Sequence, residues 1–334
     1  AVPVIGGVSC LALAVFQGIV VPASGLIAVG WLTAGGLMFM AIFVRRARVL
    51  DASSTAFDPE LVALRGRTPL VLVPIANPQN AEAMVALADA LVPAEIGRVL
   101  TLNVAVAPAG WQPGRDPQPV DAAVSVMREL LKATADAGVS AGALTTVSDD
   151  PMREIARVAR LHRCESLLLG LSEIDDDRRE RALESLLGEI DADIVVLRAR
   201  KDWQLSGARR ILIPVAGRGG QENLRARLLG SLQRTGERDV TLLRVMPEDA
   251  AEIEVRRAER ELRELADIEV RRLCKVAVVR SADAVAAIGE RADDHDLTIL
   301  GIQRLGRHKK LFGSLTRQLA QRTSCPLIII SRRG

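Results

Sequence analysis

Five residues near the C-terminal end could form a phosphate-binding turn before a helix. They are Gly301, Arg304, Gly306, Gly313 and Ser314. Glycines allow the backbone to turn tightly and to come close to a ligand, and the first N–H groups of a following helix attract anions. The segment therefore predicts a site for a nucleotide or another phosphate.

The same segment is basic, because Arg307, Lys309 and Lys310 follow the second glycine. An anionic ligand could use this positive charge. In the alternative interpretation, the glycines form tight turns and the basic side chains face water or lipid headgroups. The sequence leaves both interpretations open.

Other residues with catalytic or metal-binding chemistry are scattered. The histidines are His162, His295 and His308, and none has a Ser/His/Asp set or a metal-ligand spacing around it. The acidic run at residues 293–296 precedes an expected strand, where an exposed loop is the ordinary explanation. The cysteines are also isolated, at Cys10, Cys164, Cys274 and Cys325. We therefore expect no catalytic residue, no metal site and no enzymatic activity.

Short apolar segments alternate with amphipathic ones between residues 68 and 200. The expected strands are 70–75, 98–105, 141–147, 167–170 and 193–197. The expected helices are 81–91, 122–137, 151–162 and 181–187. In the second of these helices Val124, Met127 and Leu131 share one face. Strands separated by helices predict a parallel sheet with helices on both faces.

Residues 208–334 repeat this plan. Residues 70–76 match residues 210–216, and Thr101-Leu102 matches Thr241-Leu242 at the same offset. Later strands also correspond, 168–170 with 299–301 and 194–197 with 327–330. Repeats of this size predict two duplicated domains, 68–200 and 208–334. Each is expected to be a doubly wound, five-stranded parallel sheet.

The N-terminal segment has a different composition. From Ala1 to Val44 there is no charged residue, and the run then ends in Arg45, Arg46 and Arg48. A single membrane-spanning helix needs about 20 apolar residues, so the segment predicts a hairpin of two, about 4–20 and 26–44. Pro22 lies in the break between them, and residues 46–67 form a linker.

The arginines that follow the second expected helix predict its orientation. Positive charge beside a membrane span usually lies on the cytoplasmic side, so residues 45–334 are expected in the cytoplasm. A secretory signal would have a basic start, which this segment lacks. The first residue is not Met, and the segment is rich in small residues that suit helix packing. We expect the chain to be the C-terminal end of a larger multi-pass protein of the cell membrane.

The charge balance argues against nucleic acid as a partner. Lys and Arg number 44 against 41 Asp and Glu, so the net charge is only +3. Nucleic-acid binding usually needs a concentrated basic face and often aromatic residues for stacking, and this chain has no Tyr. Nucleic-acid binding is therefore not expected.

Two segments carry family resemblances. Residues 300–314 and 322–330 resemble the last third of a universal stress protein domain, and residues 211–215 resemble that family's first strand. The resemblance covers residues 68–332 as two tandem domains. The hairpin, with Pro3-Val-Ile-Gly-Gly near its start, resembles the last two helices of amino acid–polyamine–cation (APC) superfamily permeases, some of which carry such tandem domains as a cytoplasmic tail.

The resemblance implies an adenine-nucleotide site, from which this sequence departs. The family motif is a glycine, two residues, a glycine, nine residues and then Gly-Ser or Gly-Thr, and an Asp follows the first strand. Here Arg304 replaces the second glycine, the spacing from Gly301 to Gly313 is one residue short, and Ala76 and Ala216 replace the Asp. The first copy has an acidic loop at 172–180, which would repel a triphosphate. The resemblance thus allows ATP or another adenine nucleotide at the second domain.

Two functions follow as hypotheses. In the first, the chain is the end of a permease for amino acids or cations. Its helices would pack against upstream helices of the same transporter in the lipid bilayer, and its tail would regulate or assemble the transporter. In the second, the hairpin only anchors a nucleotide-responsive pair of universal stress domains. A homodimer formed through the cytoplasmic domains is expected in either case. The transported solute cannot be inferred from these residues.

Overall fold

The computed structural model describes most of the chain after residue 68. The described residues are 30, 31, 33–35, 37, 38, 69–77, 79, 81–92, 97–107, 111, 118–136, 138–171, 177–201, 203–216, 222–270, 274–302 and 313–331. The chain divides into two compact units, Ala1–Thr55 and Ala56–Gly334.

In the N-terminal unit the described residues, between Gly30 and Met38, are helical and exposed. Trp31 is 77% exposed and Leu37 is 60% exposed. Almost all of the expected hairpin, and the linker at 46–67, lie outside the described residues. Within the part of the chain that the structure describes, no helix has both the length and the apolar character needed to cross a membrane.

The first half of the larger unit alternates strands and helices. Its strands are β1 (Leu70–Pro74), β2 (Arg98–Val106), β3 (Ala141–Ser148), β4 (Ser166–Leu171) and β5 (Asp193–Arg198). Its helices are α5 (Ala81–Leu91), α6 (Gln118–Asp136), α7 (Pro151–Leu161) and α8 (Asp177–Glu189). All five strands are parallel, in the order β3-β2-β1-β4-β5.

The second half repeats this order after a short 3-10 helix, η3 (Leu205–Gly207). Its strands are β6 (Arg210–Pro214), β7 (Asp239–Met246), β8 (Cys274–Arg280), β9 (Leu297–Ile302) and β10 (Leu327–Ser331). Its helices are α9 (Glu222–Arg234), α10 (Glu252–Glu269), α11 (Ala284–Asp293) and α12 (Ser314–Arg322). These strands are also parallel to one another, in the order β10-β9-β6-β7-β8.

The two halves share one hydrogen-bonded sheet of ten strands. Strand β5 pairs with β10 in the antiparallel direction, with Val196 opposite Ile329 at the centre. We call this pairing the seam. Both strands are uncharged at their centres and buried on both faces, as expected for doubly covered strands. The predicted five-stranded parallel sheets are present, and their union through the seam was not predicted.

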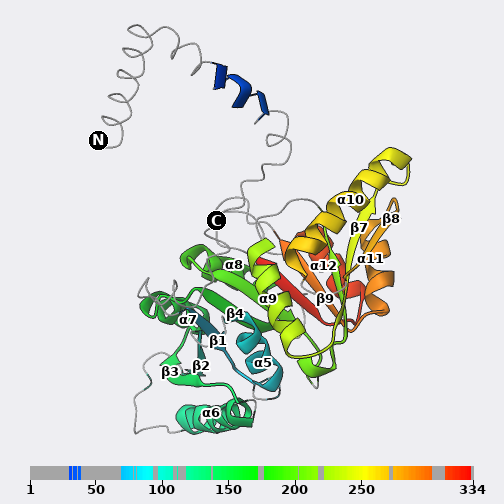
Figure 1. Cartoon of the computed structure of the whole chain (residues 1–334). Coiled ribbons are helices and arrows are strands. Elements are labelled where there is room, and N and C mark those ends of the chain that lie inside the picture. Colours follow the sequence, from blue (N-terminus) through cyan, green and yellow to red (C-terminus); the bar gives the residue numbers. More distant parts are fainter. Residues whose placement is uncertain are drawn as a thin grey trace, which may run out of the picture. The chain divides into compact units, whose positions relative to one another are not determined.

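Helices cover both faces of the sheet (Figure 1). One core includes Leu87, Leu130, Leu228 and Leu262 of helices α5, α6, α9 and α10, together with residues of both halves of the sheet. The other core includes Val158, Leu186, Ala292 and Leu319 of helices α7, α8, α11 and α12. Each core is continuous across the seam, so the two halves are stabilised together.

Two details of the sequence prediction were wrong by a small shift. Val73 lies opposite Thr101, whereas Ile213 lies opposite Leu242, so Thr101 corresponds to Leu242 and not to Thr241. The repeated Thr-Leu pair therefore misaligned these strands by one residue. A shift of one residue exchanges the two faces of a strand. A shared Thr-Leu dipeptide was therefore not enough to align the two strands correctly.

The buried face of α6 was also misplaced. Val124 and Leu131 are 46% and 44% exposed, whereas Ala123 and Leu130 are buried and Met127 packs against the core. The buried face of the helix is therefore formed by Ala123, Met127 and Leu130. The predicted stripe shared only Met127 with it, because neighbouring positions on a helix differ by about 100°.

Candidate functional site

The two halves each have a topological switch point, where neighbouring strands send their connections in opposite directions. In the second half this is between β6 and β9, and in the first half it is between β1 and β4. Ligands of open α/β sheets bind in the crevice at the carboxyl ends of such strands. We therefore take these two crevices as the candidate sites.

The second crevice contains part of the predicted phosphate turn. Gly301 is the second-last residue of β9, at this edge of the sheet, and is exposed. Helix α12 begins at Ser314 at the same edge. Gly313 is the residue before the helix, with an extended backbone (φ −62°, ψ 165°) and no side-chain cap. Its carbonyl accepts the Arg317 N–H at 3.1 Å. This geometry leaves the start of α12 accessible to an anion.

Two of the five predicted residues, Arg304 and Gly306, lie outside the described residues. The structure thus brings Gly301, Gly313 and Ser314 to one edge of the sheet. Ala216 follows β6 at this edge and is exposed, so no carboxylate stands at the position where the family has its Asp. A nucleotide here would be held by backbone groups and would lack that carboxylate contact.

The first crevice is filled differently. Met84 of α5 is buried, and a Cβ on Gly170, at the end of β4, would come within 3.1 Å of its Sδ atom. The thioether side chain thus packs directly on the glycine that corresponds to Gly301. Most of the acidic loop at 172–180 lies outside the described residues.

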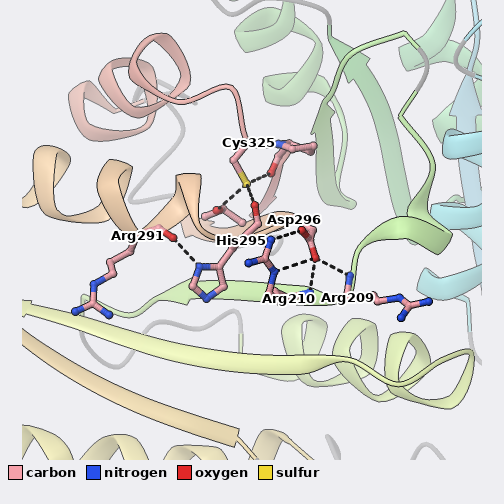
Figure 2. A network of polar contacts seen from close by, with 8 residues as sticks. Arg209, Arg210, Arg291, His295, Asp296 and Cys325 are labelled. Atoms are coloured by element: carbon pink, nitrogen blue, oxygen red, sulfur yellow. Dashed lines mark hydrogen bonds and ion pairs between the residues drawn. The ribbon is translucent and has the colours of Figure 1, made fainter.

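The acidic run at 293–296 makes bonds within the protein (Figure 2). Asp296 accepts the backbone N–H groups of Arg209 and Arg210 at 3.1 and 2.8 Å, and its other oxygen pairs with the Arg210 guanidinium at 2.9 Å. These hydrogen bonds hold the pKa of Asp296 below its usual value. Asp293 accepts a hydrogen bond from Thr323 Oγ1 at 2.7 Å. The carboxylates therefore fasten the start of β6 and the C-terminal end of α12 to the end of α11 and the α11–β9 turn.

His295 and Cys325 belong to the same network. His295 Nδ1 lies 2.6 Å from the Arg291 carbonyl (Figure 2). Its Nε2 lies 3.3 Å from Thr241 Oγ1, so both ring nitrogens have partners within the fold. The buried Cys325 thiol lies 3.4 Å from the His295 carbonyl, and burial raises its pKa. Within the described residues, no group of three His, Cys, Asp or Glu side chains is arranged to hold a metal.

A hollow beside this network was not foreseen from the sequence. It has a volume of about 560 Å³ and lies next to the seam. Its lining residues are Arg200, Trp203, Asp293, His295, Arg322, Ser324, Cys325 and Pro326. Because it contains both signs of charge and lies at the C-terminus of α12, where the helix dipole is negative, it does not resemble an anion site.

One structural feature that was not predicted could have been found in the sequence. Ser148 and Asp150 form the same turn and helix cap as Ser281 and Asp283, with each Asp accepting a backbone N–H at 3.0–3.1 Å. The repeated Ser-x-Asp spacing is a capping signal that strengthens the duplication. Arg198, which donates to the carbonyls of Ala320, Thr323 and Cys325 across the seam, has no comparable local signal.

The fold defines a doubly wound α/β protein with one topological switch point in each half of its sheet. Residues 207–331 match the family model described as the universal stress protein family. No curated protein matches the chain.

Solved structures extend the likeness to both halves. A universal stress protein from Archaeoglobus fulgidus DSM 4304 is 13% identical with a TM-score of 0.55, and the alignment covers 80% of this chain and 100% of that one. The cytoplasmic domain of a prokaryotic cation chloride cotransporter is 13% identical with a TM-score of 0.53, covering 80% and 97%. A putative universal stress protein from Pseudomonas aeruginosa UCBPP-PA14 is 11% identical with a TM-score of 0.50, and the alignment covers 80% of this chain and 95% of that one. At these identities the likeness establishes the fold.

Proposed function

We propose that the larger unit is the cytoplasmic domain of a membrane permease for amino acids or cations, of the APC type, and that it regulates or assembles the transporter. The main support is the likeness to the cytoplasmic domain of a cation chloride cotransporter, which extends over 97% of that chain. The proposal has no enzymatic step.

The N-terminal composition supports attachment to a membrane. The uncharged segment Ala1–Val44 is long enough for two spans and ends in Arg45, Arg46 and Arg48. In the proposal these residues form the last two helices of the bundle, and the folded sheet follows in the cytoplasm. A soluble stress protein would have no use for such a segment.

The residues in the two crevices favour a regulatory or structural role over a function that depends on strong nucleotide binding. In the first half Met84 packs against Gly170. In the second half Ala216 stands where the family has an Asp, although Gly313 and Ser314 keep the helix start open. Binding of an adenine nucleotide, where it occurs, would therefore be confined to the second half.

The second candidate is a membrane-anchored, nucleotide-responsive stress protein without a transport role. The uncapped start of α12 favours it, because backbone N–H groups at a helix N-terminus suit a phosphate. The two candidates share the anchor and differ in whether a ligand is required.

Membrane attachment can be tested by expressing the chain in bacterial cells and washing the membranes with alkaline carbonate. The proposal expects the chain to stay with the membranes and a variant without residues 1–44 to be released. Recovery of the complete chain in the soluble fraction would contradict both candidates.

Nucleotide binding separates the candidates. We would follow the melting temperature of the purified chain in detergent with ATP, ADP and AMP at millimolar concentration. The sensor hypothesis expects stabilisation that Gly313→Asp abolishes. Gly188→Asp in α8 is the matched control, because Gly188 also has open space around it. No stabilisation by any nucleotide would leave the regulatory or assembly domain as the surviving candidate.

A further inference from the structure

Within the part of the chain that the structure describes, the outer edge of β3 is an open sheet edge without the usual protection. Strand β3 ends the ten-stranded sheet and pairs only with β2, and no other described strand contacts its outer side. Its residues, Ala141–Ser148, include no charged residue and no proline. Native proteins usually protect such edges with charges, prolines or bulges, because an unprotected edge pairs with another strand.

The opposite end of the sheet shows the contrast. Strand β8 carries Lys275 and Arg280, whose side chains form ion pairs with Asp239 at 3.6 Å and with Glu252 at 2.8 Å. Pairing β8 with itself would bring charged side chains together along the edge. Among the described residues, charged side chains therefore protect the β8 edge of the sheet, and the β3 edge carries none.

The helix above β3 adds an exposed apolar surface. Helix α6 packs on β2 and β3, and its Val124 and Leu131 are 46% and 44% exposed. The side of α6 that faces α5 carries Glu129 and Ala133, which line a hollow together with Glu82 of α5. At about 100° per residue, Val124 and Leu131 lie on the other side of the helix, towards the β3 edge.

The seam shows how such an edge is completed within this same molecule. There β5 and β10 pair in the antiparallel direction, and α5 and α9 pack against each other across them. We propose that two copies of this chain associate in the same way, through antiparallel pairing of β3 with β3 and packing of α6 against α6.

The strand geometry determines the register. The carbonyls of Gly142 and Ser148 point towards β2, where they accept from Thr101 Oγ1 at 2.9 Å and from the Ala107 N–H at 3.1 Å. Backbone groups alternate along a strand, so Ala143 and Thr145 present theirs to the open edge. A two-fold axis at Leu144 places Ala143 of one copy opposite Thr145 of the other, and every outward-facing residue of β3 finds a partner.

Charge also favours a second copy in this orientation. Asp149 and Asp150 follow β3 directly. A parallel arrangement would bring these carboxylates from the two copies side by side, whereas an antiparallel one separates them by the length of the strand. The uncharged strand offers nothing to select a basic or acidic partner, and a two-fold axis brings identical apolar surfaces of α6 together.

The test is the mass of the complete chain in detergent micelles, measured by light scattering over a range of concentrations. The proposal expects a dimer. The variant A143K/T145K places Lys opposite Lys, and its dissociation constant should rise roughly tenfold or more. The variant A143E/T145K is the matched control, because it places Glu opposite Lys at the same exposed positions and should keep the dimer. Circular dichroism melts check that both variants are folded.

Three results would overturn the proposal. A monomeric wild-type chain would exclude the dimer. A dimer that A143K/T145K leaves intact would assign association to another surface, such as the N-terminal segment. Equal dissociation of both folded variants would exclude the register centred on Leu144. None of these outcomes depends on nucleotide binding or transport, so the dimer stands or fails independently of the proposed function.

Discussion

The two halves of the sheet repeat one topology but stabilise their equivalent helix pairs differently. In the first half, α5 and α6 pack through apolar side chains such as Leu87 and Leu130. In the second half, α9 and α10 are joined by an ion pair between Arg225 and Glu269, whose side chains are only 6% and 1% exposed. The comparison shows that the alternation of strands and helices specifies the topology, while the chemistry between helices can change.

The crevices differ in the same way. Met84 occupies the space beside Gly170 in the first half, whereas the start of α12 stays uncapped in the second. Each prediction below changes one side of this comparison.

The largest expected effect is at the buried ion pair. The Arg225 guanidinium donates to both oxygens of Glu269 at 2.6 Å. Glu269→Ala would leave a buried guanidinium without this carboxylate and should cost about 3–5 kcal/mol. Urea denaturation of the chain in detergent, followed by circular dichroism, measures the loss.

A double variant sharpens this result. R225M/E269L replaces the pair with apolar residues like those of the first half and should recover most of the stability, because a buried ion pair gains little over a well-packed apolar contact. A double variant as unstable as Glu269→Ala would mean that the second half needs the ion pair itself.

The next effect concerns the seam, where the equivalent strands β5 and β10 end differently. Strand β5 ends in Arg198, which donates to the Thr323 and Cys325 carbonyls at 2.6 and 2.8 Å, whereas β10 ends in Ser331. Arg198→Met should cost about 2–3 kcal/mol, because it leaves these carbonyls without their donor. Unchanged urea midpoints would show that β5 and β10 hold the halves together without this contact.

A smaller, pH-dependent effect is expected at Asp296. It corresponds to Glu165 of the first half, since both backbone N–H groups donate at 2.9 Å to the residue that begins the neighbouring strand. Its hydrogen bond with Arg210 lowers the pKa of Asp296, so the stabilisation is present above the unfolded-state pKa of about 3.9 and is lost as pH falls through the lower folded-state value.

Asp296→Asn should therefore cost about 1 kcal/mol at neutral pH and nothing in strong acid, as measured by thermal melts between pH 7 and pH 2. Asp294→Asn, at the exposed neighbouring position, is the control and should leave the melting temperature nearly unchanged. A constant difference across this pH range would show that the charge of Asp296 is not the cause.

The smallest expected effect concerns the reactivity of one buried cysteine thiol in each half, and it should be similar in both. Burial raises the pKa of Cys164 to about 11, and burial also raises the pKa of Cys325. Because the thiolate is the reactive form, iodoacetamide at pH 8 should label both at least about a hundredfold more slowly in the folded than in the unfolded chain. Rapid labelling of one thiol, read by mass spectrometry, would reveal local opening of that half.

The sequence by itself determined the alternating strands and helices and their duplication. Strand segments such as Ile194–Leu197 and Leu327–Ile330 could be found because runs of apolar residues between turn signals are a local property. The position of Gly313 and Ser314 at the start of α12 was also foreseen, because glycine before a helix and a hydroxyl at its first turn are local signals.

Only the tertiary structure decided which edges meet. A strand that is buried on both faces has the same apolar sequence pattern whether it pairs with a strand of its own half or of the other half. The pairing of β5 with β10 could therefore not be inferred from the sequence. The same holds for Arg225 with Glu269 and for Arg198 at α12, because each contact joins residues far apart in the chain. Packing also moved the buried face of α6 away from Val124 and Leu131, and thereby left exposed the apolar surface beside β3.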